Sequence, residues 1–472
     1  MKKRLSWFLT GVLVLMVGIC FAQGPLTPPG PPGEIYKTLD QVEPRIPINS
    51  LPYTIAAPGS YYLTKDMDYP QIVQNGITIN ASNVTIDLMG YTLKGPGRTG
   101  NTRTAITLGT GTSNITIKNG NINFWGNDGI ECDPSTNTRI LNINVSFIGD
   151  MGIVTDYNSL IVNCSVSGCT DDGVHTGFNS LVKDCVARDC ATGIYGEIAN
   201  MVVNCGAYDN NGDGIYIRIG GVIQNCIANS NAGNGIMISG SATITGCTTY
   251  NNGSNGIGFI TVKALGGEEK GGENPAPGAP ILPSRPGIHI VDCTSESNGL
   301  NGIEAGRGSR IQGCLVKSNT GNGIDIVEPI PLSIGEIYDS MTIIKNCMCY
   351  SNTKDGILVF SYAVIEGNTC VGNDNGIYVE SEGGLVLAPQ GGSAPAPPPG
   401  KGNRIEGNST MNNTDHGIYV PANSNSLIIR NWSYGNVDDY HIGTGNTFGP
   451  ILTGDLSAND NPHANYTFLI PL

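Results

Sequence analysis

Glycine followed by a branched aliphatic residue recurs along most of the chain at a nearly constant interval. The pairs run from Gly129-Ile130 to Gly417-Ile418, and most successive pairs are 20 to 23 residues apart. Within one repeat, Ile236 and Ile238 alternate with Met237, which is the period-two pattern of a short strand with one buried face. Because so short a repeat cannot bury its apolar side alone, the period predicts a solenoid of stacked coils.

A second register runs in phase with the first. Eleven residues after the branched residue, or at the equivalent place in an expanded coil, stand Cys164, Cys185, Cys205, Cys226, Cys247, Cys293, Cys314 and Cys347, followed by Asn368, Asn408 and Asn431. Five residues further on stand Asn210, Asn231, Asn252, Asn298, Asn319, Asn352, Asn373, Asn413 and Asn436. Identical residues at one phase predict columns of stacked side chains, with asparagine amides bonded along a ladder. We expect the cysteines to be buried free thiols; disulfide pairs and metal ligation remain the alternatives.

Each repeat holds three short strand patterns separated by polar turns, and helical periodicity is lacking. This favours an all-β fold, a right-handed parallel β-helix of about 14 coils with a cap at each end. The expected organisation is a signal peptide at 1–22, a proline-rich linker at 23–33, an N-terminal cap at 34–75, the β-helix at 76–437 and a C-terminal cap at 438–472.

Three repeats are longer than the others. The extra residues lie near 263–286, 328–340 and 381–402, each just after a Gly-Ile strand. Since coils stack in register, these insertions are expected along one edge of the solenoid. There they would either border a cleft or decorate the surface, and both interpretations stay open.

Composition and charge narrow the function. Lys2, Lys3 and Arg4 precede an apolar stretch from Leu9 to Ile19, as in an export signal, so we expect a secreted, periplasmic or cell-surface bacterial protein. No membrane-spanning segment is expected once this signal is removed. The chain has a net charge of −14, and loss of the three leader cations leaves 22 basic against 39 acidic residues, or −17. Such a chain repels nucleic acid, and it repels acidic polysaccharides unless calcium or a local basic patch intervenes.

Outward positions of the Gly-Ile strands carry the candidate chemistry. We assign Asp172 or Glu197 as general acid, Asp213 as base, His175 as the residue that orients them, and Arg218 as a holder of a substrate carboxylate. The expected substrate-binding residues are the tyrosines of the same strand face, Tyr195, Tyr216, Tyr378 and Tyr419. Tyrosine rings pack on sugar rings while polar groups bond hydroxyls. The competing interpretation is an ordinary solvated sheet face.

The repeated N-G-I, x-I-x-N-C and S-N-x-x-N-G-I motifs resemble the right-handed parallel β-helix repeat of exported bacterial proteins. That group includes pectate-lyase-like and polygalacturonase-like enzymes, alginate epimerases and a periplasmic copper-site maturation protein. The resemblance covers about residues 75–440. It implies the fold strongly and function weakly, because these motifs are structural. The lead-in around Lys37-Thr38-Leu39-Asp40 resembles exported β-helix proteins of uncharacterised function.

Enzyme signatures of this group are matched only in part. Asp171-Asp172-Gly173-Val174-His175 resembles the paired aspartates of polygalacturonase-like enzymes, whose other motifs are missing here. Arg218 with Asp213 and Glu197 resembles the calcium-and-arginine arrangement of pectate lyases, so calcium is the one cofactor that the resemblance suggests. No set of metal-ligating residues stands out. We therefore expect a non-catalytic structural or carbohydrate-binding protein that contacts a polysaccharide or cell-surface glycan. The alternative is a polysaccharide lyase or glycoside hydrolase acting on the loop-flanked strand face.

Overall fold

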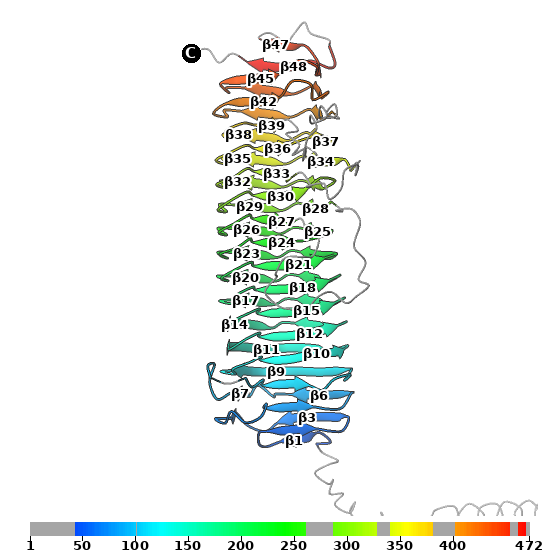
Figure 1. Ribbon diagram of the computed structural model, residues 1–472, viewed down its shortest axis with the longest axis vertical. Coiled ribbons are helices and arrows are strands. Elements are labelled where there is room, and N and C mark those ends of the chain that lie inside the picture. Colours follow the sequence, from blue (N-terminus) through cyan, green and yellow to red (C-terminus); the bar gives the residue numbers. More distant parts are fainter. Residues whose placement is uncertain are drawn as a thin grey trace, which may run out of the picture. The chain divides into compact units, whose positions relative to one another are not determined.

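The computed structural model describes residues 43–100, 102–260, 287–327, 340–380, 402–453 and 461–468. The chain divides into two compact units, Met1–Arg45 and Ile46–Leu472. The described part of the second unit is a parallel β-solenoid whose coils follow one another in chain order (Figure 1). Its described residues form strands and turns without helices, which confirms the predicted all-β class.

One sheet receives a single strand from every coil, and each strand pairs in parallel with those of the coils before and after it. The strands of this 16-stranded sheet are β2 (Tyr53–Ile55), β5 (Ile77–Ile79), β8 (Ile106–Leu108), β10 (Ile130–Thr136), β12 (Ile153–Tyr157), β15 (Val174–Phe178), β18 (Ile194–Ile198), β21 (Ile215–Ile219), β24 (Ile236–Ile238), β27 (Ile257–Phe259), β30 (Ile303–Gly306), β33 (Ile324–Val327), β36 (Ile357–Val359), β39 (Ile377–Val379), β42 (His416–Val420) and β45 (Asp438–Ile442).

The other strands form a 32-stranded sheet, to which most coils contribute two short strands. Its first half comprises β1 (Ile46–Ile48), β3 (Gly59–Leu63), β4 (Met67–Asp68), β6 (Val84–Asp87), β7 (Thr92–Lys94), β9 (Ile115–Asn123), β11 (Arg139–Ile148), β13 (Leu160–Val162), β14 (Ser165–Cys169), β16 (Leu181–Lys183), β17 (Val186–Arg188), β19 (Met201–Val203), β20 (Gly206–Tyr208), β22 (Gly221–Gln224), β23 (Ile227–Asn229), β25 (Ala242–Thr245) and β26 (Thr248–Tyr250). Its second half comprises β28 (His289–Val291), β29 (Thr294–Glu296), β31 (Arg310–Gln312), β32 (Leu315–Lys317), β34 (Thr342–Lys345), β35 (Met348–Tyr350), β37 (Ala363–Glu366), β38 (Thr369–Val371), β40 (Arg404–Glu406), β41 (Ser409–Met411), β43 (Leu427–Ile429), β44 (Trp432–Tyr434), β46 (Thr447–Phe448), β47 (Ile451–Thr453) and β48 (Asn465–Phe468).

The solenoid has more coils than the 14 predicted, since the sheet that receives one strand per coil holds 16 strands. The two additional strands lie in the segments predicted to be caps. β2 pairs in parallel with β5, and β45 pairs in parallel with β42. Coiling therefore starts before residue 76 and continues past residue 437. These end coils were missed because their sequences lack the Gly-Ile pair, while backbone pairing does not need it.

The predicted signal peptide and linker lie outside the described residues, and so do nearly all residues of the three insertions. The strands that flank the insertions are described. The insertions follow β27, β33 and β39, which are equivalent strands of the 16-stranded sheet, and precede β28, β34 and β40. Each insertion therefore falls between equivalent strands of its coil.

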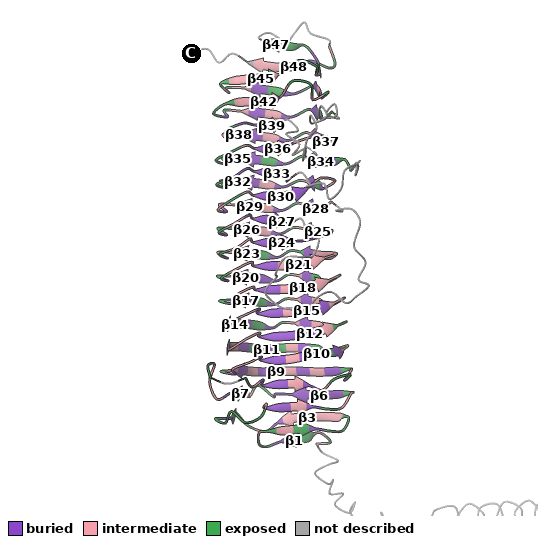
Figure 2. Cartoon of the chain, in the orientation of Figure 1, coloured by how far each residue is buried: buried purple, intermediate pink, exposed green. Residues whose placement is uncertain are grey.

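Columns of identical apolar residues fill the interior. Ile194, Ile215 and Ile236 are partners in consecutive strands, and all three are fully buried. Removing one isoleucine side chain from water contributes roughly 1.5–3 kcal/mol. Buried and partly exposed positions alternate at the start of strands such as β18 and β21 (Figure 2), as the period-two pattern predicts. The core is therefore a vertical repeat of one layer.

The repeated glycine before each branched residue is required by close packing between coils. A Cβ on Gly193 would lie 2.5 Å from the carbonyl oxygen of Gly214 in the next coil, and one on Gly214 would lie 2.6 Å from that of Gly235. Neither glycine has a positive φ. Backbone conformation therefore does not require glycine at these two positions, whereas any side chain here would collide with the neighbouring backbone.

The cysteines stack as predicted. All 13 described cysteines are buried free thiols. Cys205, Cys226 and Cys247 occupy adjoining coils, where the backbone N–H of Cys226 donates to the Cys247 Sγ at 3.5 Å. Each of these thiols also donates to the carbonyl two residues earlier, as Cys205 does to Val203 at 3.3 Å. The column therefore satisfies backbone groups as well as filling space.

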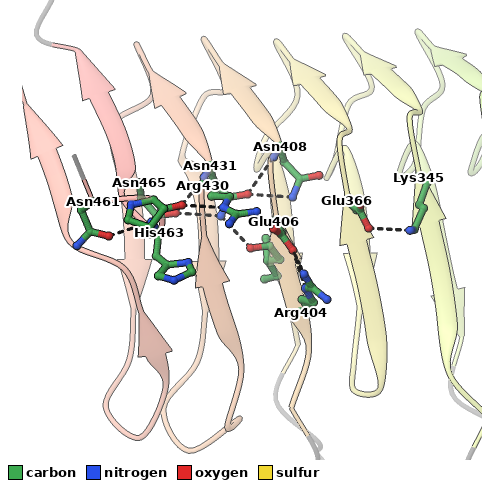
Figure 3. A network of polar contacts seen from close by, with 12 residues as sticks. Lys345, Glu366, Arg404, Glu406, Asn408, Arg430, Asn431, Asn461, His463 and Asn465 are labelled. Atoms are coloured by element: carbon green, nitrogen blue, oxygen red, sulfur yellow. Dashed lines mark hydrogen bonds and ion pairs between the residues drawn. The ribbon is translucent and has the colours of Figure 1, made fainter. Parts of the chain in front are cut away.

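The predicted asparagine ladder is confirmed. From Asn210 to Asn436, each side-chain amide donates to the Oδ1 of the next asparagine at 2.7–3.2 Å. The parallel ladder that takes over from cysteine, Asn408 to Asn431 to Asn465, ends on β48 (Figure 3). Asn465, which lies beyond the sequence repeat, is therefore the last residue of this ladder.

Ion pairs also join side chains of consecutive coils (Figure 3). Lys345 pairs with Glu366 at 2.7 Å. Glu406, whose side chain is only 9% exposed, is bracketed by Arg404 and Arg430, with Arg430 Nη1 at 2.8 Å from its Oε1. A carboxylate so far from water needs such compensation, and the two guanidinium groups provide it.

Candidate functional site

The outward residue after each core isoleucine of the 16-stranded sheet forms a continuous column. His175, Tyr195 and Tyr216 are partners in β15, β18 and β21. The His175 and Tyr195 rings are stacked, with centroids 4.7 Å apart and planes 16° apart, while Tyr195 and Tyr216 meet edge to face at 5.1 Å. Parallel strand register therefore brings three of the predicted site residues together.

Polar contacts join these rings to the predicted acids. His175 Nδ1 lies 3.0 Å from Asp172 Oδ2. The Tyr195 hydroxyl donates to Glu197 Oε1 at 3.0 Å, and Arg218 Nη1 donates to Glu197 Oε2 at 2.7 Å. The result is a network of side chains in which Glu197 receives two donors. We call these five residues, Asp172, His175, Tyr195, Glu197 and Arg218, the first patch.

Tyr216 and Asp213 have other partners. The Tyr216 hydroxyl lies 2.6 Å from Ser239 Oγ in the next coil. Asp213 Oδ1 accepts the backbone N–H of Asn234 at 2.6 Å and its side-chain amide at 2.9 Å. Asp213 lies in the turn two residues before β21, whereas Arg218 lies near the end of that strand, so the two are separated along the chain direction of the coil.

Asp213 belongs to a column of turn residues. Equivalent positions in the next coils are asparagines whose Oδ1 atoms accept the backbone N–H of the following coil, as Asn234 does from Asn255 at 3.1 Å and Asn301 does from Asn322 at 2.8 Å. Asp213 makes the same contact as these asparagines. Its observed contact is therefore that of a structural ladder.

In the first patch and at Asp213, burial and neighbouring carboxylates shift the pKa values of several side chains. Burial lowers the pKa of His175, but the hydrogen bond with Asp172 and the charges of Asp172, Glu197 and Asp171 outweigh it, so the net shift is upward. Burial raises the pKa of Asp213 despite its two bonds from Asn234. Desolvation and the neighbouring Glu197 carboxylate raise the pKa of Tyr195.

A second aromatic group lies further along the same column. Tyr378 and Tyr419 are register partners with rings 4.6 Å apart and 6° from parallel. His441 continues the stack on Tyr419 at 4.8 Å and 11°. Both tyrosines are partly exposed and His441 is exposed. We call Tyr378, Tyr419 and His441 the second patch; the predicted binding tyrosines thus fall into two separate groups.

Two acids lie between the patches, and asparagine amides hold both. Glu304 Oε2 accepts from Asn255 and Asn301 at 3.1 and 3.2 Å, and Asp325 Oδ2 accepts from Asn301 and Asn322 at 3.0 Å each. Calcium prefers six to eight oxygen ligands. Glu304 Oε2 and Asp325 Oδ2 already accept N–H donors. These contacts therefore do not favour a calcium site at the two residues.

Three residues that the sequence interpretation did not single out also meet on this face. His416, Asp438 and His441 each place one ligand atom within 4.8 Å of the other two. His416 occupies the turn position that is asparagine in several earlier coils. This change from asparagine to histidine is the feature of the sequence that could have pointed to the group. Asp438 and His441 follow the last Gly-Ile pair, where the sequence repeat no longer places residues.

A surface hollow formed by described residues lies elsewhere. It has a volume of about 430 Å³ and is lined by Ile72, Gly100, Thr102 and Arg103, in the N-terminal coils. None of the predicted site residues lines it. The two patches are instead parts of an outward strand face.

These observations define a parallel β-solenoid stabilised by cross-coil side-chain ladders. A family model described as "right handed beta helix region" matches residues 104–264 and 282–453, and the chain belongs to this family. The predicted right-handed parallel β-helix is thereby confirmed.

Solved structures similar to this chain match it at low sequence identity. The A-module of a mannuronan C-5 epimerase from Azotobacter vinelandii is 15% identical, with 69% of this chain and 89% of that chain covered and a TM-score of 0.42. A periplasmic alginate epimerase is 10% identical, with 88% and 78% covered and a TM-score of 0.33. A pectate lyase is 13% identical, with 66% and 80% covered and a TM-score of 0.32.

Comparison with curated proteins finds no match. Within the described ranges, the structure contains no helix with the length and apolar character needed to cross a membrane.

Proposed function

We propose that this protein is an exported, non-catalytic β-helix that binds a polysaccharide or cell-surface glycan along the outer face of its 16-stranded sheet. The mutual pairing of the residues predicted to be catalytic carries this proposal. Asp172 is bonded to His175, Glu197 to both Tyr195 and Arg218, and Asp213 to Asn234.

This pairing favours binding over proton transfer. A general acid and base must both reach the reacting bond of the substrate. Asp213 lies in the turn before β21 and already serves the turn ladder, whereas Arg218 lies near the end of β21 and contacts Glu197 of β18. Fixed, partly exposed side chains are better suited to hold a ligand without changing it, because little conformational entropy is lost on binding.

The second patch supplies the contact surface for sugar. Tyr378 and Tyr419 are held parallel by their stacking and remain partly exposed. A tyrosine offers an apolar ring together with a hydroxyl, which suits the mixed surface of a carbohydrate. A rigid column of such rings at the strand spacing would contact successive sugar units of a chain.

The test is retention on glycans combined with an assay for product release. The secreted form would be incubated with insoluble neutral glycans and with soluble acidic polysaccharides, each in calcium and in chelator. We expect retention without released product, weakened by Tyr378→Ala and Tyr419→Ala. The matched control is Tyr350→Ala, which removes an exposed tyrosine from β35 of the other sheet.

Two results would overturn the proposal. Product release that is lost in Asp213→Ala or Arg218→Ala would identify a lyase or hydrolase. Equal retention of the wild type and the Tyr378→Ala and Tyr419→Ala variants would remove the second patch from the binding surface. Dependence of retention on calcium would add the ion as a cofactor of binding.

A further inference from the structure

Two histidines and an aspartate converge at the last coil of the 16-stranded sheet. Strands β42 and β45 pair so that His416 lies beside Asp438 and Tyr419 beside His441. One ligand atom from each of His416, Asp438 and His441 lies within 4.8 Å of the others. Residues 22 and 25 positions apart thus form one compact group on the surface.

The hydrogen bonds of His416 fix which of its nitrogens faces the group. Its Nδ1 lies 2.9 Å from Asn375 Oδ1 and 3.2 Å from Asp415 Oδ2. The Asn375 amide nitrogen donates to Asp355 at 2.7 Å, so its oxygen is the atom turned toward His416. Both neighbours of Nδ1 are acceptors, and Nδ1 therefore carries the proton in the neutral ring. The lone pair is left on Nε2.

The free lone pair faces a carboxylate at a distance that does not suit a hydrogen bond. His416 Nε2 lies 3.9 Å from Asp438 Oδ2, and His441 Nδ1 lies 3.5 Å from the same oxygen. Hydrogen bonds between such atoms are about 2.7–3.2 Å long. Ligand atoms of a tetrahedral ion with bonds of about 2.0–2.1 Å lie roughly 3.3–3.5 Å apart. The spacing is therefore closer to that of ligands around one ion.

Neighbouring side chains hold the group in place. The Tyr419 ring stacks on His441 at 4.8 Å and meets the edge of His416 at 5.1 Å. Asp438 Oδ1 accepts the backbone N–H of Tyr440 at 3.3 Å, which leaves its Oδ2 toward the histidines. A hydrogen bond on the far side of a ligating imidazole, as His416 makes to Asn375 with Asp415 close by, is the usual way in which proteins orient it.

The three side chains are accessible to solvent, and the chain carries a net negative charge. The side chains of His416, Asp438 and His441 are 18%, 45% and 49% exposed. An ion could enter from solvent and keep open positions for water. A net charge of −14 favours a cation over an anion at any such site.

We propose that His416, Asp438 and His441 form a binding site for a divalent transition-metal ion, with zinc as the ion that the ligand set favours. Imidazole nitrogens select zinc and its neighbours over calcium or magnesium, which prefer oxygen ligands. Asn375 and Asp415 act as positioning residues for His416. His441 belongs both to this site and to the second patch, so the metal site borders the proposed glycan surface, and it lies in a part of the chain where sequence periodicity ends.

The experiment is a calorimetric titration of ZnCl₂ into the chelator-treated protein, prepared without an oligohistidine tag, at neutral pH. We expect one zinc ion per chain. Asp438→Asn and His441→Gln should each weaken binding at least about tenfold, since loss of even an outer partner costs 10–100-fold. His289→Gln, which replaces an exposed histidine on β28, is the matched control and should bind as the wild type does.

Two further readouts separate this site from the buried thiols. A Co²⁺-loaded sample should lack the charge-transfer band of thiolate ligation. Binding should also weaken as pH falls through the range in which imidazole is protonated.

His441 lies in the last strand of its sheet and outside the ladders, so its variant tests the site even if His416→Gln perturbs the fold. Equal zinc affinity of the wild type and the His441→Gln and Asp438→Asn variants, or no binding at about 1 mM zinc, would overturn the proposal.

Discussion

Arg218 donates a 2.7 Å hydrogen bond to Glu197 across two consecutive coils, from β21 to β18. Their side chains are 27% and 23% exposed, so the pair is only partly screened by water. The same carboxylate also accepts the Tyr195 hydroxyl. The contact ties one coil to the next on the outer face, beyond what the backbone ladder provides.

Arg218→Met should lower the free energy of unfolding by about 1–2 kcal/mol, because Glu197 then keeps its desolvation while losing its charged donor. The measurement is denaturant unfolding followed by circular dichroism. Lys183→Met is the control, since Lys183 pairs with Asp184 at 3.7 Å with both side chains nearly half exposed, and it should cost less than about 0.5 kcal/mol. Equal effects of the two variants would show that the Arg218 contact is not special.

Asn319→Ala should be among the most damaging single changes in the chain. The fully buried Asn319 side chain donates to Asn352 and Ser295 and accepts from the backbone and side chain of Asn298. Each buried partner left without a bond costs about 1–3 kcal/mol, so we expect a total loss of at least about 3 kcal/mol.

The control for Asn319 is Asn144→Ala. Asn144 donates one exposed bond to Asn121 at 3.0 Å, and its loss should cost at most about 1 kcal/mol. Both variants are measured by denaturant unfolding. Similar costs for the buried and the exposed asparagine would contradict the view that buried ladders stabilise the solenoid.

The thiols should be unreactive in the native state and free after unfolding. The hydrogen bond with Cys247 and burial raise the pKa of Cys293 to about 12, and burial raises the pKa of Cys132. The thiolate, which is the reactive species, is therefore scarce at these two residues, and burial keeps reagents away from all 13 described cysteines. Mass spectrometry after alkylation should show slow native labelling and, in denaturant, equal labelling with and without a reductant. Labelling that increases with reductant would reveal disulfides.

Asp128 should make stability depend on pH. Burial raises its pKa to about 7, with a smaller opposing effect from the Met151 N–H and further upward shifts from Asp150, Glu131 and Asp171. A carboxyl whose folded pKa exceeds its unfolded pKa adds stability at low pH and loses it as pH rises toward 7. The unfolding free energy of Asp128→Asn relative to wild type should therefore rise from pH 5 to pH 8. Parallel curves over this range would refute the shift.

The sequence determined the layers of this protein. Residues at one phase of a 21-residue repeat must stack when coils pair in register, so the isoleucine core, the buried thiol column and the asparagine ladder could be predicted from spacing alone. The grouping of His175, Tyr195 and Tyr216 followed for the same reason, since all three share one phase.

The tertiary structure decided those contacts that a residue's position within the repeat does not specify. It separated Asp213 from Arg218 along the coil, and it showed that the repeated glycines avoid a neighbouring carbonyl. It also brought His416 to Asp438 and His441, because backbone pairing continues after the sequence repeat has ended. Periodicity places residues along the stacking direction, whereas contacts across a strand and at the end coils depend on side-chain geometry that only the folded chain contains.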